Sequence, residues 1–276
     1  MKYRKAILST LFVLIFSIQL FSIRVVSLSP SITEIIFKIG HGDSIVGNTK
    51  FCNYPIQACS IKKIGGYLDI NMEMIIDLKP DLIFHYPEHL SRLNKLRKFI
   101  RLVQVSHKNI SDLLESIRII SRELNDISSG KALIRHINEK FDEIKKKKKI
   151  PGRKTVMIVI GRDPGQLKNI TIIGRGDFLN EIIHISGGKN AYEGSISYPS
   201  VSIESIIKMN PDLILEFSFL KNAPDEESIK KIWKKFPLIK AVRNANIRII
   251  KDDYWVRPGP RIGNIAESLY EMLLSD

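Results

Sequence analysis

The sequence predicts an α/β protein of two similar lobes, each with a parallel-rich central sheet, joined by one long linker helix. The first observation is an internal repeat: residues 70–83 (INMEMIIDLKPDLI) recur 131 positions later as residues 201–214 (VSIESIIKMNPDLI), with seven of fourteen positions identical. A shorter echo runs in the same order, residues 34–40 (EIIFKIG) and 181–187 (EIIHISG). The third observation is that strand-like and helix-like segments alternate throughout the chain. A single, widely spaced duplication indicates two lobes rather than a solenoid.

Each copy of the long repeat has the pattern of a helix followed by a buried strand. Asn71 or Ser202 can cap the start of the helix, because a short polar side chain accepts a bond from a free backbone N–H. The helix ends near Pro80 or Pro211, since the residue before proline disfavours the helical region. The apolar runs 81–84 and 212–216 then have the length and composition of buried strands.

In chain order, the predicted N-terminal lobe covers residues 23–110. It begins with a strand at 24–28, a helix opened by Pro30 or Ser31, and a strand at 45–47. A loop-rich stretch (48–67), the first repeat copy, a helix at 88–99 and a strand at 101–105 complete it.

The predicted linker covers residues 111–150 and is helical. Residues 111–124 and 128–149 have helical spacing, with Leu133, Ile137, Phe141 and Ile144 on one stripe. Because this region lies between the two repeat copies, we expect it to connect the lobes.

The predicted C-terminal lobe covers residues 151–276. Strands are expected at 155–160, in the second repeat copy and at 247–250. Helices are expected at 177–186, 225–236 and 261–274.

Length and composition describe a globular protein with a strongly basic surface. A chain of 276 residues allows about two domains. The formal charge of +14 permits contact with nucleic acid or an anionic membrane, but no nucleic-acid motif accompanies it. We therefore expect a solvated basic surface, no nucleic-acid partner and a monomer.

The first 22 residues resemble an export signal. Lys2, Arg4 and Lys5 precede an almost wholly apolar run at 6–21, which is shorter than the roughly twenty residues of a membrane span. The cleavage site is poorly marked, so both a cleaved signal peptide and a retained inner-membrane anchor stay open. Either predicts a periplasmic protein. In that oxidising compartment Cys52 and Cys59, seven apart, can form a local disulfide or remain free.

Several motifs, taken together and in order, resemble a known family. They are RVVSLSPSITEIIFKIG, CNYP, GGYLDINMEMIIDLKPDLI, GGKNAY, YPSVSIESIIKMNPDLI and RPGPRI. The set resembles the class III substrate-binding proteins of ABC importers over residues 24–274, with the cobalamin-binding branch most similar and the ferric-siderophore branch next. The resemblance implies two α/β lobes, a long connecting helix and a ligand in the cleft between the lobes.

The resemblance also implies which residues contact the ligand. They lie in loops at the carboxyl ends of strands, where open α/β sheets place ligands, and most are aromatic: Phe51, Tyr54, Tyr67, Tyr86, Tyr198, Asp253, Tyr254, Trp255 and Arg257. Aromatic faces suit a flat macrocycle, and an arginine suits an oxygen-rich acceptor. The implied ligand is a corrinoid or a ferric chelate such as a siderophore or haem, and no cofactor is expected. Core packing is the alternative for each aromatic, and Trp255 can instead anchor the last helix.

Glu73 and Glu204 occupy the same position of the two repeat copies. A carboxylate in the first turn of a helix interacts with free N–H groups and the positive end of the dipole, which is a sufficient local role. The resemblance implies a second role, docking on arginines of the permease dimer. A matched pair of carboxylates on a bilobed protein suits a two-fold partner.

Other chemistry receives less support from the sequence. His85 and His89 have the spacing of two metal ligands on one helix, but Pro87 lies between them, and the other histidines form no cluster in sequence. A Zn or Mn binder of the same superfold stays open as an alternative. No nucleophile motif or dinucleotide fingerprint is present, so a cofactor-binding enzyme is the last alternative and a non-enzymatic protein is expected.

Overall fold

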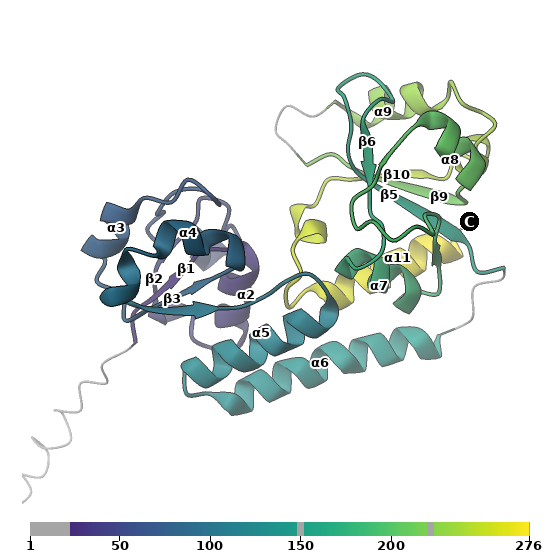
Figure 1. Ribbon diagram of the computed structural model, residues 1–276. Coiled ribbons are helices and arrows are strands. Elements are labelled where there is room, and N and C mark those ends of the chain that lie inside the picture. The colour runs from purple at the N-terminus through teal and green to yellow at the C-terminus, as the bar shows by residue number, and fades with distance from the viewer. Residues whose placement is uncertain (1–22, 148–151, 220–223, 276) are drawn as a thin grey trace, which may run out of the picture.

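The computed structural model describes residues 23–147, 152–219 and 224–275. Two α/β lobes stand beside each other, and a pair of helices runs beneath both of them (Figure 1). The signal peptide or anchor predicted at 1–22 lies outside the described residues. Among the residues that are described, no helix is long and apolar enough to cross a membrane.

The sheet of the N-terminal lobe has four strands, all parallel, in the order β2-β1-β3-β4. Its strands are β1 (Val25–Ser27), β2 (Ile45–Asn48), β3 (Leu82–His85) and β4 (Arg101–Gln104). The helix α2 (Pro30–Lys38) covers one face, while α3 (Met72–Asp77) and α4 (Leu90–Leu93) cover the other. The carboxyl ends of these parallel strands meet at one edge of the sheet, which places the following loops together.

The sheet of the C-terminal lobe has the order β10-β9-β5-β6-β8, with the short β7 (Lys189–Asn190) beside β5. Strands β5 (Thr155–Gly161), β9 (Leu213–Phe217) and β10 (Ile247–Ile250) are parallel, and β6 (Ile170–Ile172) and β8 (Ser200–Val201) add antiparallel pairs. The helices α7 (Phe178–Ile185) and α11 (Ile262–Leu274) cover the face toward the linker. The outer face carries α8 (Ile203–Met209), α9 (Glu226–Trp233) and α10 (Lys240–Arg243).

The sequence repeat corresponds to α3–β3 in one lobe and α8–β9 in the other. Asn71 Oδ1 accepts a hydrogen bond from Met74 N at 2.9 Å, and Ser202 Oγ does the same from the third residue of its helix, so both predicted caps are confirmed. The repeated aspartate also plays the same role in both lobes. Asp81 Oδ2 and Asp212 Oδ2 each accept a bond of 2.7 Å from the backbone N–H that begins the neighbouring central strand of their lobe.

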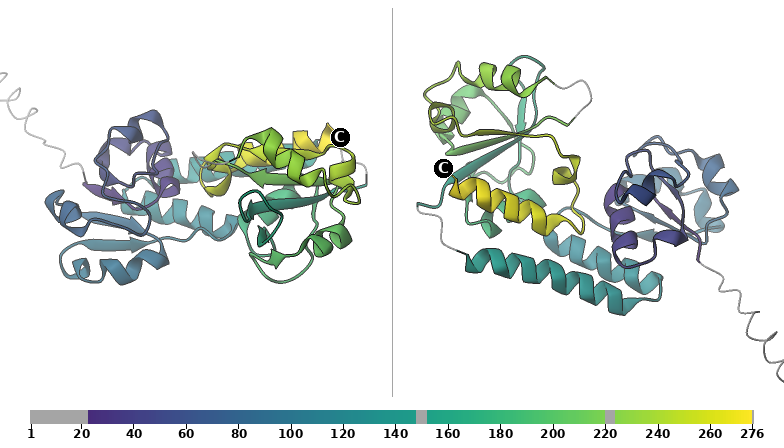
Figure 2. Two further views of the ribbon diagram at one scale, coloured as in Figure 1. Left: turned by 90° about the horizontal axis from the view of Figure 1, so that it is seen from above. Right: turned by 180° about the vertical axis from the view of Figure 1, so that it is seen from behind.

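The linker is a helical hairpin rather than one uninterrupted helix. Helix α5 (Ile110–Glu123) returns beneath the N-terminal lobe, and the 20-residue α6 (Ile127–Lys146) then crosses to the C-terminal lobe (Figure 2). Asn125, in a left-handed conformation, lies in the turn between them. The long helix is therefore present, but Ile110–Glu123 form a second helix packed against it.

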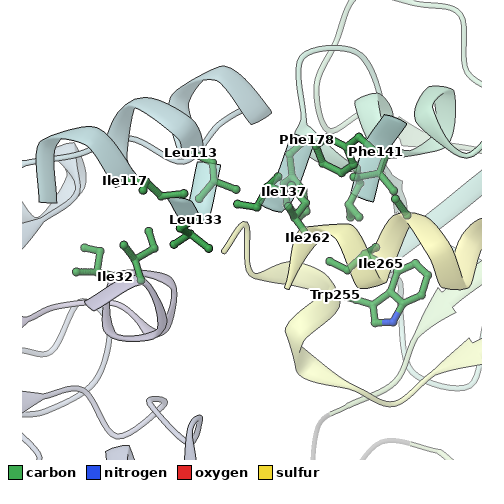
Figure 3. Packing of buried hydrophobic residues seen from close by; sticks show 14 of the residues in the cluster. Ile32, Leu113, Ile117, Leu133, Ile137, Phe141, Phe178, Trp255, Ile262 and Ile265 are labelled. Atoms are coloured by element: carbon green, nitrogen blue, oxygen red, sulfur yellow. The ribbon is translucent and has the colours of Figure 1, made fainter. Parts of the chain in front are cut away.

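A single hydrophobic core continues from one lobe through the linker into the other. The stripe predicted on α6 is buried, and it packs between α2 and α5 on one side and α7 and α11 on the other (Figure 3). Ile32, Leu133, Phe178 and Ile265 belong to this one cluster although they come from both lobes and the linker. Separating the lobes would expose part of this core, at about 25 cal/mol per Å² of apolar surface.

Candidate functional site between the lobes

The segments that meet between the lobes follow the carboxyl ends of strands. In the N-terminal lobe these are the loops after β1, β2, β3 and β4, and in the C-terminal lobe the segment after β10. This segment contains a short 3-10 helix, Asp253–Val256, just before α11. Most of the residues predicted to bind ligand therefore lie in the expected loops.

A bidentate ion pair joins the lobes directly. Arg261, at the start of α11, donates from Nε and Nη2 to the two carboxylate oxygens of Glu34 on α2, at 2.8 and 2.6 Å. The guanidinium also lies 4.2 Å from the ring centre of Tyr54 and 4.7 Å from that of Tyr254, one ring from each lobe. We call these four residues the inter-lobe clasp. Burial raises the pKa of Glu34, and the ion pair with Arg261 opposes that rise.

A second polar contact lies beside the clasp. Asn53 donates from Nδ2 to Asp253 Oδ2 at 3.0 Å and accepts a bond of 2.6 Å from Arg257 Nη1, so it binds both residues from the opposite lobe. Arg257 and Asp253 also form an ion pair with each other. Two predicted ligand residues, Asp253 and Arg257, thus lie together, and both bind Asn53 of the opposite lobe. Two others, Tyr54 and Tyr254, lie in the neighbouring clasp.

The clasp borders a pocket of about 520 Å³ that both lobes and the linker line. Glu34 and Tyr54 contribute from the N-terminal lobe, Arg261 and Asn264 from α11, and His136 from α6. This pocket shows that the junction of the three parts is not completely filled.

Two tyrosine–carboxylate pairs, one from each lobe, form the rest of the site. The Tyr67 hydroxyl donates to Glu88, and the Tyr198 hydroxyl donates to Asp177 Oδ2 at 2.7 Å. Burial raises the pKa of both phenols, and the accepting carboxylates raise it further, so both tyrosines are neutral donors.

His107, just beyond β4, lies beside the first of these pairs. Its Nε2 is 3.9 Å from Glu88 Oε1, and the Asp177 carboxylate acts on it from the other lobe. Burial nevertheless lowers the pKa of His107, and the carboxylates oppose that shift only in part. Each lobe thus holds one tyrosine by its hydroxyl, Tyr67 in the N-terminal lobe and Tyr198 in the C-terminal lobe.

His107, distant in sequence, joins His85 and His89 around Tyr86. The ring centres of Tyr86 and His107 are 3.9 Å apart, and those of Tyr67 and His89 are 4.7 Å apart. His89 Nδ1 accepts a bond from Tyr86 N, and His85 Nδ1 lies 2.9 Å from the carbonyl oxygen of Tyr86. Burial lowers the pKa of His89 to about 4 and also lowers that of His85. Among the described residues, the buried atoms His89 Nε2 and His107 Nδ1 have no hydrogen-bond partner.

Sequence reasoning found no histidine cluster, although one signal was available. His85 ends β3 and His107 follows β4, which are adjacent parallel strands, so their side chains are expected at the same sheet edge. Proline between His85 and His89 excludes one continuous helix but does not keep the two rings apart.

Two of the predicted ligand contacts are not available in this conformation. Tyr86 is 3% exposed and packs in the core under His107, and Trp255 is 2% exposed beside Ile265 of α11 (Figure 3). The structure corrects the prediction for Trp255, since its burial favours the alternative role of anchoring the last helix. Phe51 and Tyr54 are about half exposed, and Tyr198 is 54% exposed.

The proposed disulfide is not formed. Cys52 is buried and accepts a hydrogen bond of 3.3 Å from Thr33 Oγ1, whereas the exposed Cys59 Sγ lies 3.6 Å from the carbonyl oxygen of Asn53. The two thiols thus occupy different environments, and of the two outcomes left open by the sequence the structure has free cysteines.

Glu73 and Glu204 are exposed in the first turns of α3 and α8, on the outer faces of the two lobes. A bond from Ser202 lowers the pKa of Glu204. Both carboxylates are accessible to a partner and close to the free N–H groups of a helix start, so the geometry is compatible with the local role and with docking.

No group of three or more His, Cys, Asp or Glu side chains is arranged to hold a metal ion within the described ranges. The histidine cluster is thus a set of ring contacts rather than a preformed metal site.

Comparison with known proteins identifies the architecture. A family model described as periplasmic binding protein matches residues 25–254. An uncharacterized ABC transporter substrate-binding lipoprotein of Bacillus subtilis, YvrC, is 28% identical over 262 residues, which is 92% of this chain and 80% of the relative. A vitamin B12-binding protein of Vibrio parahaemolyticus is 27% identical over 245 residues, covering 87% and 86%.

Solved structures share the fold. The periplasmic haem-binding protein HutB of Vibrio cholerae superposes with a TM-score of 0.81 at 20% identity, and the match covers 91% of this chain and 99% of that one. The predicted two-lobe α/β fold is therefore confirmed.

Proposed function

The chain belongs to the periplasmic binding protein family, and on that premise we propose that it captures a corrinoid between its lobes and delivers it to an ABC importer. The family relation and its substrate-binding relatives support an extracytoplasmic protein with a small-molecule ligand and a permease partner. We propose that the carrier is non-enzymatic, monomeric and periplasmic, and that it has no cofactor of its own.

The observation that carries the proposal is the matched pair of anchored tyrosines, Tyr67 and Tyr198. Each phenol comes from a different lobe, and its hydroxyl is held by a carboxylate of the same lobe. A ring fixed by its hydroxyl offers its face to a planar ligand at a small cost in rotamer entropy. Relatives named vitamin B12-binding proteins, 27–28% identical over about nine-tenths of the chain, favour a corrinoid as that ligand.

Haem is the second candidate, and one observation favours it. His89 Nε2, beside Tyr67, and His107 Nδ1, beside Tyr86, are buried and have no hydrogen-bond partner in the described part of the chain. Imidazole and phenol are groups that bind haem iron. A ferric siderophore shares the need for aromatic and polar contacts, but no unpartnered group in the described residues favours it in particular.

Isothermal titration calorimetry with cyanocobalamin, cobinamide, haem and a ferric hydroxamate separates these classes. We expect binding of a corrinoid, and a loss of about 2- to 10-fold in affinity for Tyr67→Ala or Tyr198→Ala, since an aromatic contact contributes about 0.5–1.5 kcal/mol. Phe99→Ala is the matched control, because Phe99 is exposed far from the site at the start of β4.

Two results contradict the proposal. One is that none of the four ligands binds while Zn²⁺ or Mn²⁺ does. The other is that Tyr198→Ala binds the corrinoid as tightly as the unchanged chain. If haem binds in preference to the corrinoids and His107→Ala loses that binding, haem becomes the proposed ligand.

A further inference from the structure

The excess of positive charge includes a four-residue pattern that occurs once in each lobe. Leu96-Arg97-Lys98-Phe99 precedes β4, and Trp233-Lys234-Lys235-Phe236 precedes the segment that leads to β10. Both follow the helix that comes after the repeat strand. We call these two segments the basic corners.

The two corners are built alike. Leu96 and Trp233 are buried in the outer layers of their lobes, and the dibasic pair that follows each is exposed. No ion pair to Arg97, Lys98, Lys234 or Lys235 occurs among the described residues. Their charge is therefore available to a partner.

A large apolar side chain is exposed in or next to each corner. Phe99 is 83% exposed within the first corner, and Leu238, two residues after the end of the second corner, is 69% exposed. Folding gains nothing from leaving these side chains in water. Cations around an exposed aromatic or aliphatic side chain are typical of segments that rest in the interfacial region of a bilayer.

The basic corners lie in the same outer layers of the lobes as Glu73 and Glu204, the carboxylates considered for docking. Helices α3 and α4 cover one face of the first sheet, and α8 and α9 cover the corresponding face of the second, away from the linker (Figure 1). Both corners and both of Glu73 and Glu204 belong to these outer layers. Each corner precedes a strand and so lies at the amino end of its sheet, away from the carboxyl ends that form the site between the lobes.

We propose that the two basic corners bind the anionic headgroups of a phospholipid bilayer. The occupant is a lipid surface rather than a protein, because the two corners lie on different lobes and each combines unpaired cations with an apolar side chain in or next to it. A protein partner would need a matching acidic patch for each lobe. A membrane presents anionic headgroups over its whole surface. This contact does not depend on which ligand binds between the lobes.

Tryptophan reporters in the full chain test the proposal. The native Trp233 and Trp255 are buried and not accessible to a lipid quencher. Phe99→Trp and Leu238→Trp place a reporter in each corner, and Ile127→Trp places one on the exposed start of α6, on the linker side. With vesicles of brominated phosphatidylglycerol and phosphatidylcholine, we expect quenching at positions 99 and 238 and none at 127. Vesicles of brominated phosphatidylcholine alone should quench none of them.

Removing charge at one corner tests whether lipid binding depends on the corners or on the basic surface as a whole. Since each cation near an anionic leaflet contributes about fivefold in binding, Arg97→Gln/Lys98→Gln should raise the lipid concentration for half quenching at position 99 about twentyfold. The matched control, Lys131→Gln/Arg135→Gln, removes the same charge from exposed positions of α6 and should leave it unchanged.

Equal quenching at positions 99, 238 and 127 would overturn the proposal, as would equal quenching by neutral and anionic vesicles. An equal effect of the two charge variants would also overturn it, because the contact would then follow net charge. Circular dichroism of every variant shows that the fold is kept. None of these measurements uses a ligand or a permease, so their failure is distinct from failure of the proposed function.

Discussion

Breaking the inter-lobe clasp should destabilise the whole molecule. The change is Arg261→Met, which keeps most of the side-chain volume but leaves the Glu34 carboxylate unpaired. Glu34 is 3% exposed, and both of its oxygens accept bonds from Arg261. Removing one partner of a buried ion pair costs about 3–5 kcal/mol. Because the Arg261 side chain is about one-fifth exposed, we expect the lower end, about 3 kcal/mol.

The loss of stability should depend on pH in a definite direction. Burial already raises the pKa of Glu34, and Arg261 opposes the rise. Without Arg261 the folded-state pKa lies further above the unfolded value, so the folded state binds more protons in that range. Stability of the variant therefore falls as pH rises through the Glu34 pKa, and the cost should be smaller at pH 5 than at pH 8.

Urea unfolding at pH 5 and pH 8, followed by circular dichroism, measures both effects. A cost of 3 kcal/mol corresponds to a midpoint temperature about 6–10 °C lower in a parallel thermal scan. Arg135→Met, at an exposed position of α6, is the control and should change stability by less than about 0.5 kcal/mol. A cost for Arg261→Met below about 1 kcal/mol, or one equal at the two pH values, would refute the reasoning.

Three further outcomes are expected. Ile137→Ala, in the core shared by both lobes, should cost about 2–4 kcal/mol and keep a single unfolding transition; two separate transitions would show that the lobes are independent. Since the pKa of His89 is about 4 in the folded state, acidification from pH 7 to 5 should lose about 2 kcal/mol through this residue, and His89→Gln should flatten that profile. The double variant Glu73→Gln/Glu204→Gln should leave ligand affinity unchanged in calorimetry and weaken binding to the permease in a pull-down; a lost ligand site would contradict this division.

The elements that sequence could predict are those determined by local pattern. The repeated helix–strand unit needs only a cap, an apolar stripe and a proline, all visible in residues 70–83 and 201–214. The stripe Leu133, Ile137 and Phe141 predicted a buried helix face because helical periodicity alone determines which side chains share a face. The split of the linker was missed because Asn125 and its neighbours form only a short turn between two helical patterns.

The contacts between the lobes could not be predicted in the same way. Arg261 and Glu34 are 227 positions apart, so nothing in the local sequence pairs them. One signal did exist. Glu34 and Glu181 are equivalent in the short echo, and both bind across a boundary: Glu34 holds Arg261, and Glu181 Oε2 accepts a bond of 2.7 Å from Ile110 N at the start of the linker. A repeated acid in an otherwise apolar helix indicates a partner outside its own lobe.

These contacts also bear on how the two lobes can move. A hinge needs a boundary where little is buried, and here the boundary contains a bidentate ion pair, two aromatic rings and a continuous apolar core. Wide opening would separate Arg261 from a carboxylate that has no water contact and would expose the side chains of α2 packed on α5. A movement of the lobes by a few degrees would keep the ion pair and leave the α2 side chains buried, because side chains can adjust to it. The rings of Tyr54 and Tyr198 are about half exposed and so remain accessible without such opening.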